Sequence, residues 1–102
     1  DIIIRKGENI AAKEVEDVLY EHPAIAEIAV IGLPDDKLGE RCCAVVIARE
    51  GEDPPTLDDI VAFCRAAGLA NQKIPEQLEI VTELPRNASG KVLKYQLQAQ
   101  FD

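Results

Sequence analysis

The feature that most constrains the fold is a near-continuous run of β-type apolar residues, RCCAVVIA, at residues 41–48. In a strand with one face in water, apolar and polar residues alternate, because successive side chains point to opposite faces. A run without that alternation predicts a strand that is buried on both faces. Other elements must therefore cover both sides of the sheet to which this strand belongs.

The rest of the chain supplies shorter strands and amphipathic helices. We expect the order β-α-β-β-α-β-α, with strands at residues 2–4, 24–32, 41–48 and 78–81 and helices at residues 11–21, 56–68 and 91–101. Residues 33–40 and 50–55 are rich in proline, glycine and acids, and are predicted loops. Strands interleaved with two- and three-turn helices predict an α+β fold, in which a small mixed β-sheet packs with about three helices.

Local signals support the first two helices. Val15, Val18 and Leu19 recur at helical spacing, and charged residues occupy the opposite side. A His-Pro pair ends this first helix, because helical geometry is disfavoured before proline. Thr56 followed by Asp59 resembles a capping box, which marks the start of the second helix. This second helix is expected to bury Ile60, Phe63 and Cys64.

Composition excludes several classes of protein. The 102 residues fit one domain, and 47% hydrophobic residues with only 4% aromatics predict an aliphatic core. A formal net charge of −8 argues against a nucleic-acid or anionic-membrane surface, both of which need clustered positive charge. No apolar run approaches the length of a membrane span.

The three cysteines, Cys42, Cys43 and Cys64, match neither a metal-binding spacing nor a CxxC redox motif. Two of them are adjacent within the apolar run, where buried free thiols are common. No metal site is predicted. The lack of a disulfide framework favours a reducing compartment, so we expect a cytoplasmic location.

The C-terminal segment, residues 85–101, is the strongest candidate for a site. It contains no acid and three basic residues, Arg86, Lys91 and Lys94. Lys91 follows a glycine at the predicted start of the last helix, where unpaired N–H groups and the helix dipole favour an anion such as phosphate or carboxylate. A simpler interpretation also fits, in which Ser89 caps the helix and Lys91 is an ordinary surface lysine.

The same segment does not match a Walker A loop. That motif needs a glycine five residues before the Gly-Lys pair and a serine or threonine after it. Pro85 and Val92 occupy those two positions here. The last helix is instead predicted from an apolar stripe made by Leu93, Leu97 and Phe101.

The polar segment RKGEN, residues 5–9, is a second candidate because it combines two cations, a glycine and an asparagine. An ordinary strand-to-helix connection explains it equally. The remaining polar residues are assigned structural roles. His22 ends its helix, the acids at 35–36 lie in a turn, and those at 58–59 lie in a helical first turn, which favours carboxylates.

Taken together, three ordered motifs resemble the C-terminal domain of the adenylate-forming superfamily, which includes acyl- and aryl-CoA synthetases, peptide-synthetase adenylation domains and beetle luciferase. The motifs are the opening DIII with RKGENI, then KEVEDVLYEHPAIAEIAVIGLPDDKLGE, then LPRNASGKVLK. The resemblance covers essentially the whole chain. It implies that residues 1–102 are a single C-terminal lid domain of a larger two-domain ligase, whose large N-terminal domain is a separate unit.

The resemblance also implies roles for particular residues. Lys91 would contact the acyl carboxylate and the α-phosphate during adenylation, and Asp1 would be the hinge about which the domain rotates. In the second orientation Gly7 would line the pantetheine channel of CoA, with Glu8 and Asn9 shaping the same turn. A side chain in place of Gly7 would block the thiol's approach.

Four further positions complete this assignment. Ser89 and Gly90 would form the lysine loop, and the Gly-Lys-Val-Leu sequence is more like that of an acyl-CoA ligase than of a peptide synthetase. CoA ligases often carry a glycine where this chain has Lys6, so Lys6 and Arg5 are candidates for contacts with CoA phosphates. With alanines at the start of the first helix, Asn9 is left as its candidate cap.

The expected function is therefore that of an AMP-forming acyl-CoA ligase, acting on a fatty or other aliphatic carboxylic acid. ATP and CoA would be substrates, and Mg²⁺ would accompany ATP, bound mainly by the large N-terminal domain. That domain would be the main partner, and the 102-residue chain alone should fold without turning over substrate. The alternatives are an aryl-CoA ligase, a peptide-synthetase adenylation domain, or a non-catalytic interaction module of the same fold.

Overall fold

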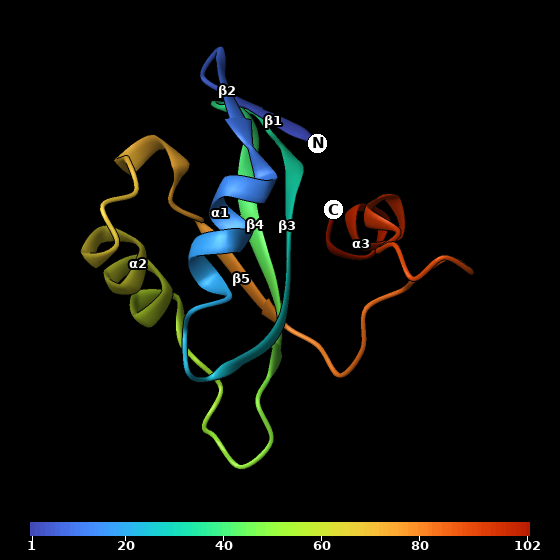
Figure 1. Ribbon diagram of the computed structural model, residues 1–102. Helices are drawn as coiled ribbons and strands as arrows, with labels where there is room; N and C mark the ends of the chain where they lie inside the picture. Colours follow the sequence, from blue (N-terminus) through green and yellow to red (C-terminus); the bar gives the residue numbers. More distant parts are fainter.

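The sheet is built around one central strand, β4 (Gly39–Ala48), in the computed structural model of residues 1–102 (Figure 1). β4 pairs antiparallel with β3 (Ile25–Asp35) and, on its other edge, parallel with β5 (Gln77–Ile80). β1 (Ile2–Arg5) meets β4 near Gly39 and forms an antiparallel hairpin with β2 (Glu8–Ala11). The sheet is therefore mixed, as predicted, with the order β2-β1-β4-β3 and β5 beside β4.

Helices cover both faces of this sheet (Figure 1). α1 (Ala12–Leu19) and α2 (Leu57–Ala66) pack on one face, and a short 3₁₀ helix, η1 (Asn71–Lys73), follows α2. α3 (Lys94–Phe101) packs on the other face. Among these helices, none combines the length and the apolar character needed to cross a membrane.

The side chains of β4 divide between the two faces. Cys42, Ala44 and Val46 join the core beneath α1 and α2, whereas Cys43 and Val45 join the core beneath α3. All five are fully buried. The prediction of a strand buried on both faces is confirmed, and the α+β class follows from the helices that provide the cover.

The predicted order of strands and helices is confirmed, and the structure adds one strand, β2. The turn between β1 and β2 has two residues with positive φ, Lys6 (52°) and Gly7 (76°), which is the backbone that a tight hairpin needs. Ile3 pairs with Ile10, and both are buried. Asn9 lies within this hairpin ladder and α1 has no side-chain cap, so the expectation that Asn9 caps the first helix is wrong.

The predicted loop at residues 33–40 is much shorter than expected, because β3 runs on to Asp35 and β4 begins at Gly39. Asp35 closes the turn, since its carboxylate accepts hydrogen bonds from the backbone N–H groups of Lys37 and Leu38, both at 2.9 Å. These bonds hold the pKa of Asp35 below its usual value. The structural role assigned to this acid is confirmed.

The capping box at the start of α2 is also confirmed. Asp59 N–H donates to the Thr56 hydroxyl at 3.1 Å, and Thr56 N–H donates to the Asp59 carboxylate at 2.9 Å. Within α2, Phe63 is only half-buried, where burial was expected; it packs at the margin of the core, against the ring of His22 with centroids 4.9 Å apart. The Nδ1 atom of His22 accepts a hydrogen bond from the Ala24 N–H, which is a structural role.

Candidate functional site

The lysine loop is a tight turn that its own backbone and one side chain hold in shape. Asn87 N–H donates to the Lys91 carbonyl and Gly90 N–H donates to the Asn87 carbonyl, both at 2.9 Å. The Asn87 side-chain oxygen accepts from the N–H groups of Ser89 and Lys91, at 2.9 and 3.0 Å. Gly90 has a φ of 85°, which a side chain would strain. The turn therefore fixes the backbone from which Lys91 projects.

Lys91 does not lie at a helix N-terminus, contrary to the prediction. α3 begins at Lys94, and Lys91 belongs to an extended stretch in which Val92 bridges to Arg86. Leu93 N–H donates back to the Pro85 carbonyl at 2.8 Å, so the chain enters α3 from a closed loop. The positive end of the α3 dipole therefore lies beyond Lys91, and the lysine presents its own charge alone.

The interpretation that Ser89 caps the last helix is also wrong. Its N–H group is bound by Asn87 within the loop, and the N-cap position of α3 is Leu93, which makes no side-chain cap. The physical reason is that the Arg86–Val92 bridge competes with helix formation over the three residues before Lys94. Residue spacing alone does not reveal such a bridge.

Lys91 is the free cation of the lysine loop. Its side chain is exposed, and none of the six ion pairs in the structure includes it. Arg86, by contrast, pairs with Glu27 of β3 and donates to the Gly90 carbonyl at 2.7 Å. Arg86 thus ties the loop to the sheet, while Lys91 remains available for an anion from outside this chain.

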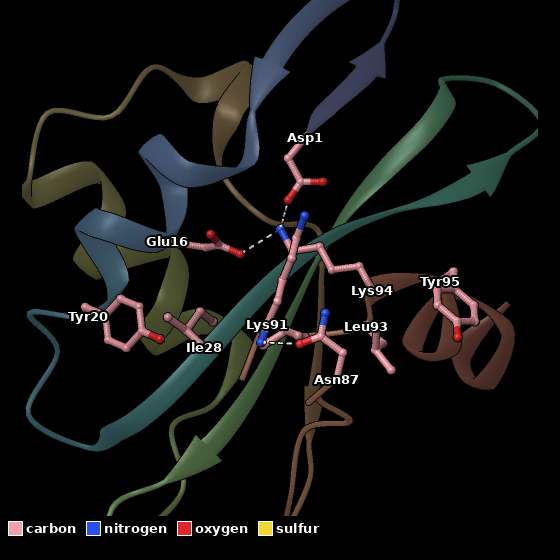
Figure 2. Close-up of a pocket in the computed structure, with 10 residues that line it drawn as sticks. Asp1, Glu16, Tyr20, Ile28, Asn87, Lys91, Leu93, Lys94 and Tyr95 are labelled. Carbon is pink, nitrogen blue, oxygen red and sulfur yellow. Dashed lines mark hydrogen bonds and ion pairs between the residues drawn. The ribbon is translucent and has the colours of Figure 1, made fainter. Parts of the chain in front are cut away.

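An open pocket of about 510 Å³ brings the two ends of the chain together (Figure 2). Its lining includes Asp1 just before β1, Glu16 of α1, Tyr20 just after α1, and Lys91 of the lysine loop. Lys94 at the start of α3 completes this wall. The predicted hinge and the predicted catalytic lysine therefore lie in one pocket, although 90 positions separate them in the sequence.

Lys94 occupies the middle of this pocket and has two acidic partners (Figure 2). Its Nζ atom lies 2.9 Å from an oxygen of Glu16 and also pairs with the carboxylate of Asp1. The same Glu16 oxygen accepts the Val30 N–H at 2.8 Å. The side chains of Lys94 and Glu16 are only 18% and 17% exposed. Sequence reasoning placed neither residue in a site, although Lys94 stood out as part of the acid-free tail.

The pocket does not offer a ligand set for Mg²⁺. Its two carboxylates, Asp1 and Glu16, are both committed to Lys94. Nowhere in residues 1–102 do three or more histidine, cysteine or acidic side chains gather in a way that could hold a metal ion.

The second predicted site, the β1–β2 turn, lies apart from Lys91. It borders a shallow pocket of about 300 Å³, lined by Arg5, Lys6, Glu8, Asn71 and Gln72, which shares no residue with the pocket of Lys91. Arg5 is paired with Glu76 at 2.7 Å, so Lys6 is the free cation here. Gly7 has a φ of 76° and open space around it, because an added Cβ would meet no atom of this chain within 4 Å.

The cysteines are unsuited to nucleophilic chemistry. All three are buried free thiols, as the sequence predicted. Burial raises the pKa of Cys42 and of Cys43 to about 12, and that of Cys64 to about 11, so the reactive thiolate is disfavoured in the folded chain. These residues pack the two cores and take no part in either pocket.

Known proteins are similar to this chain in sequence and in fold. Residues 14–91 match the family described as the AMP-binding enzyme C-terminal domain. The chain is 42% identical over 98 residues to the medium-chain fatty-acid–CoA ligase of Escherichia coli (strain K12), which covers 96% of this chain and 17% of that protein. It is also 42% identical over 102 residues to the vibriobactin-specific 2,3-dihydroxybenzoate-AMP ligase of Vibrio cholerae, covering 100% of this chain and 19% of that protein.

A solved structure agrees with both sequence matches. The Mycobacterium tuberculosis fatty acyl CoA synthetase superposes with a TM-score of 0.89 and 40% identity, over 99% of this chain and 20% of that chain. The chain thus spans no more than about a fifth of the length of these relatives. Since the match extends over most of the residues, the chain belongs to the family of AMP-binding enzyme C-terminal domains.

Proposed function

We propose that this chain is the mobile C-terminal domain of an AMP-forming acyl-CoA ligase, with Lys91 as its catalytic residue in the adenylation step. One observation carries the proposal. Lys91 is an exposed cation without an acidic partner, on a turn held by Asn87, in the same pocket as Asp1. The family match supports it, because the matched region includes Lys91.

The chemistry of adenylation accounts for a free cation at this place. A carboxylate oxygen attacks the α-phosphorus of ATP, pyrophosphate leaves, and negative charge shifts among the carboxylate and phosphoryl oxygens. A positioned cation stabilises that charge more than it stabilises the separated substrates, which lowers the barrier. Because Lys91 has no ion-pair partner to surrender, its charge is available to these oxygens without breaking a contact.

The β1–β2 turn is assigned to the second half-reaction. There the thiol of CoA attacks the acyl carbonyl and AMP leaves. Gly7 supports this role, because its surroundings within the chain are open and leave room for a narrow ligand. Lys6, the free cation of the turn, is the proposed contact for a phosphate of CoA, which its unpaired charge supports. The turn and Lys91 line different pockets, so a rotation of the domain about Asp1 is needed to use each in succession.

The remaining assignments concern the whole enzyme. The partner of this domain is a large N-terminal domain that binds ATP with its Mg²⁺ and the acyl group. A fatty or other aliphatic acid is the proposed substrate, in line with the name of the E. coli relative. Three buried free thiols suit a reducing compartment such as the cytoplasm.

An aromatic acid is the second candidate substrate. The relative from Vibrio cholerae, named for 2,3-dihydroxybenzoate, is as similar in sequence as the fatty-acid ligase. This domain does not discriminate between the two, because its pockets are lined by the hinge and lysine loop rather than by an acyl cavity. Adenylation of hexanoate, decanoate and benzoate by the full-length protein, measured side by side, decides between them.

The test of the proposed function is Lys91→Ala in the full-length protein. We expect pyrophosphate exchange to fall by about 100-fold or more, the scale of losing one electrostatic contact in the transition state. Thioester formation from prepared acyl-adenylate should persist, because Lys91 has left the reacting atoms by then. Lys37→Ala is the matched control, since Lys37 is also exposed and outside every ion pair. If exchange survives in Lys91→Ala, the catalytic assignment is wrong.

A further inference from the structure

The Asp1–Lys94–Glu16 cluster does more than neutralise charge. It joins three places that are remote in sequence: the residue before β1, the middle of α1 and the start of α3. Glu16 is anchored to β3, because its carboxylate also accepts the Val30 N–H at 2.8 Å. Lys94 is thus held on one side by a carboxylate that the sheet keeps in place, and on the other side it holds Asp1.

Asp1 is attached to this domain at two points. Its carbonyl accepts the Ala12 N–H at 3.1 Å, which fixes the peptide group that follows its Cα atom. Its carboxylate pairs with Lys94, which fixes its Cβ atom. With the carbonyl group and Cβ both held, rotation about the Cα–C bond is restricted. Of the backbone bonds of Asp1, the N–Cα bond is then the one that these two contacts do not restrict.

We propose that Lys94 is a positioning residue that clamps Asp1 to Glu16 and so fixes where the domain's hinge rotation takes place. The proposal rests on the proposed function only in taking Asp1 as the hinge. Without the clamp, the Cα–C bond of Asp1 is also free to rotate, and each of the two orientations of the domain is less well defined.

The clamp also sets the place of Lys91 relative to the hinge. Lys94 is three residues from Lys91, and both line the pocket that Asp1 borders (Figure 2). Because the Nζ atom of Lys94 forms ion pairs with two carboxylates, Lys94 is not available to bind a substrate. Its effect on adenylation passes through the position of Lys91, where small displacements reduce the rate.

The test uses four variants of the full-length protein. Lys94→Met breaks the clamp, and Lys94→Arg keeps its charge. A double variant, Lys94→Gln with Glu16→Gln, breaks the clamp without leaving the largely buried Glu16 carboxylate unpaired, in case Lys94→Met does not fold. Lys13→Met is the matched control, because the Lys13–Asp17 pair also involves α1 but its lysine is 81% exposed, against 18% for Lys94.

Two readouts are measured in each variant. The first is the ratio of the kcat values of the two half-reactions, which a general loss of folded enzyme leaves unchanged. We expect it to shift by about fivefold or more in Lys94→Met and in the double variant, and by less than about twofold in Lys94→Arg and Lys13→Met. The second is hydrogen exchange at the Ala12 amide, which should be faster only where the clamp is broken.

The outcomes separate the two proposals. An unchanged kcat ratio together with an unchanged Ala12 exchange rate in the clamp-breaking variants overturns the clamp, even if Lys91→Ala abolishes adenylation. Faster Ala12 exchange with a shifted ratio supports it. If Lys91→Ala leaves adenylation intact, the proposed function fails, while the exchange rate of Ala12 still reports whether Lys94 holds Asp1.

Discussion

Gly32, in the middle of β3, provides a sharp test of how the β1–β2 hairpin is held to the sheet. A Cβ atom added to Gly32 would lie 2.6 Å from Oε2 of Glu40 and 3.2 Å from a methyl group of Ile3. The other oxygen of that carboxylate accepts the Ile4 N–H at 2.9 Å. We predict that Gly32→Ala displaces the Glu40 carboxylate and breaks its bond to β1.

The net effect of Gly32→Ala on the free energy of unfolding is the difference between the loss of this hydrogen bond and the gain from a more restricted unfolded chain. The lost hydrogen bond to a charged and partly exposed acceptor is worth about 1–2 kcal/mol. Gly32 does not have positive φ, so alanine fits its backbone and returns about 0.5–1 kcal/mol by restricting the unfolded chain. We therefore expect a net loss of about 1 kcal/mol in the free energy of unfolding, and a fall in Tm of about 4–8 °C for a domain of this size.

The assay is thermal and urea unfolding of the 102-residue chain in a double-mutant cycle with Glu40→Ala. In the Glu40→Ala background the carboxylate is absent, so Gly32→Ala should stabilise the chain by about 0.5–1 kcal/mol, less the cost of the 3.2 Å contact with Ile3. The expected coupling is about 1–2 kcal/mol. If Gly32→Ala is equally destabilising in both backgrounds, the clash with Glu40 is not the cause, and the account of how β1 is held is refuted.

Two further predictions concern the β1–β2 turn and the thiols. Gly7→Leu in the full-length protein should leave adenylation within about twofold and block thioester formation. Gly51→Leu is the control, because Gly51 has a similar positive φ (83°) and similarly open space, and it should spare both half-reactions. An equal loss of thioester formation in the two variants would point to backbone strain instead. Because burial raises the pKa of Cys42 and Cys43 from 9.0 to about 12, and of Cys64 to about 11, their contribution to stability is full below pH 9.0 and is lost as the pH rises toward those values. Unfolding midpoints measured from pH 8 to 11 should therefore fall less steeply in a variant with alanine at all three positions, and parallel curves would contradict the assignment.

Local and periodic patterns predicted much of this fold. The apolar run at residues 41–48 predicted that β4 is buried on both faces, since alternation along a strand is a property of neighbouring residues. The capping box of Thr56 and Asp59 was predictable for the same reason, because its two partners are three residues apart. β2 was missed, because four residues give too short a pattern to identify a strand without its partner.

The candidate site was predicted only in part. The residue types before Lys91 predicted a turn that ends in Gly90 and Lys91. The lack of acids in residues 85–101 is compatible with a Lys91 side chain that has no ion-pair partner. The start of α3 was misplaced by three residues, because the Arg86–Val92 bridge that delays the helix is set by the closure of the loop. A propensity argument weighs each residue against its neighbours along the chain and cannot include such a bridge.

The sequence by itself thus determined most of the strands and helices, the strand that is buried on both faces, and which lysine is a candidate for catalysis. Only the tertiary structure decided that Lys94 lies between Asp1 and Glu16, and that the turn at Gly7 and the lysine loop line separate pockets. The physical reason is distance along the chain. Contacts between residues 1, 16 and 94 arise from the packing of β1, α1 and α3 around a shared sheet, and no local pattern encodes them.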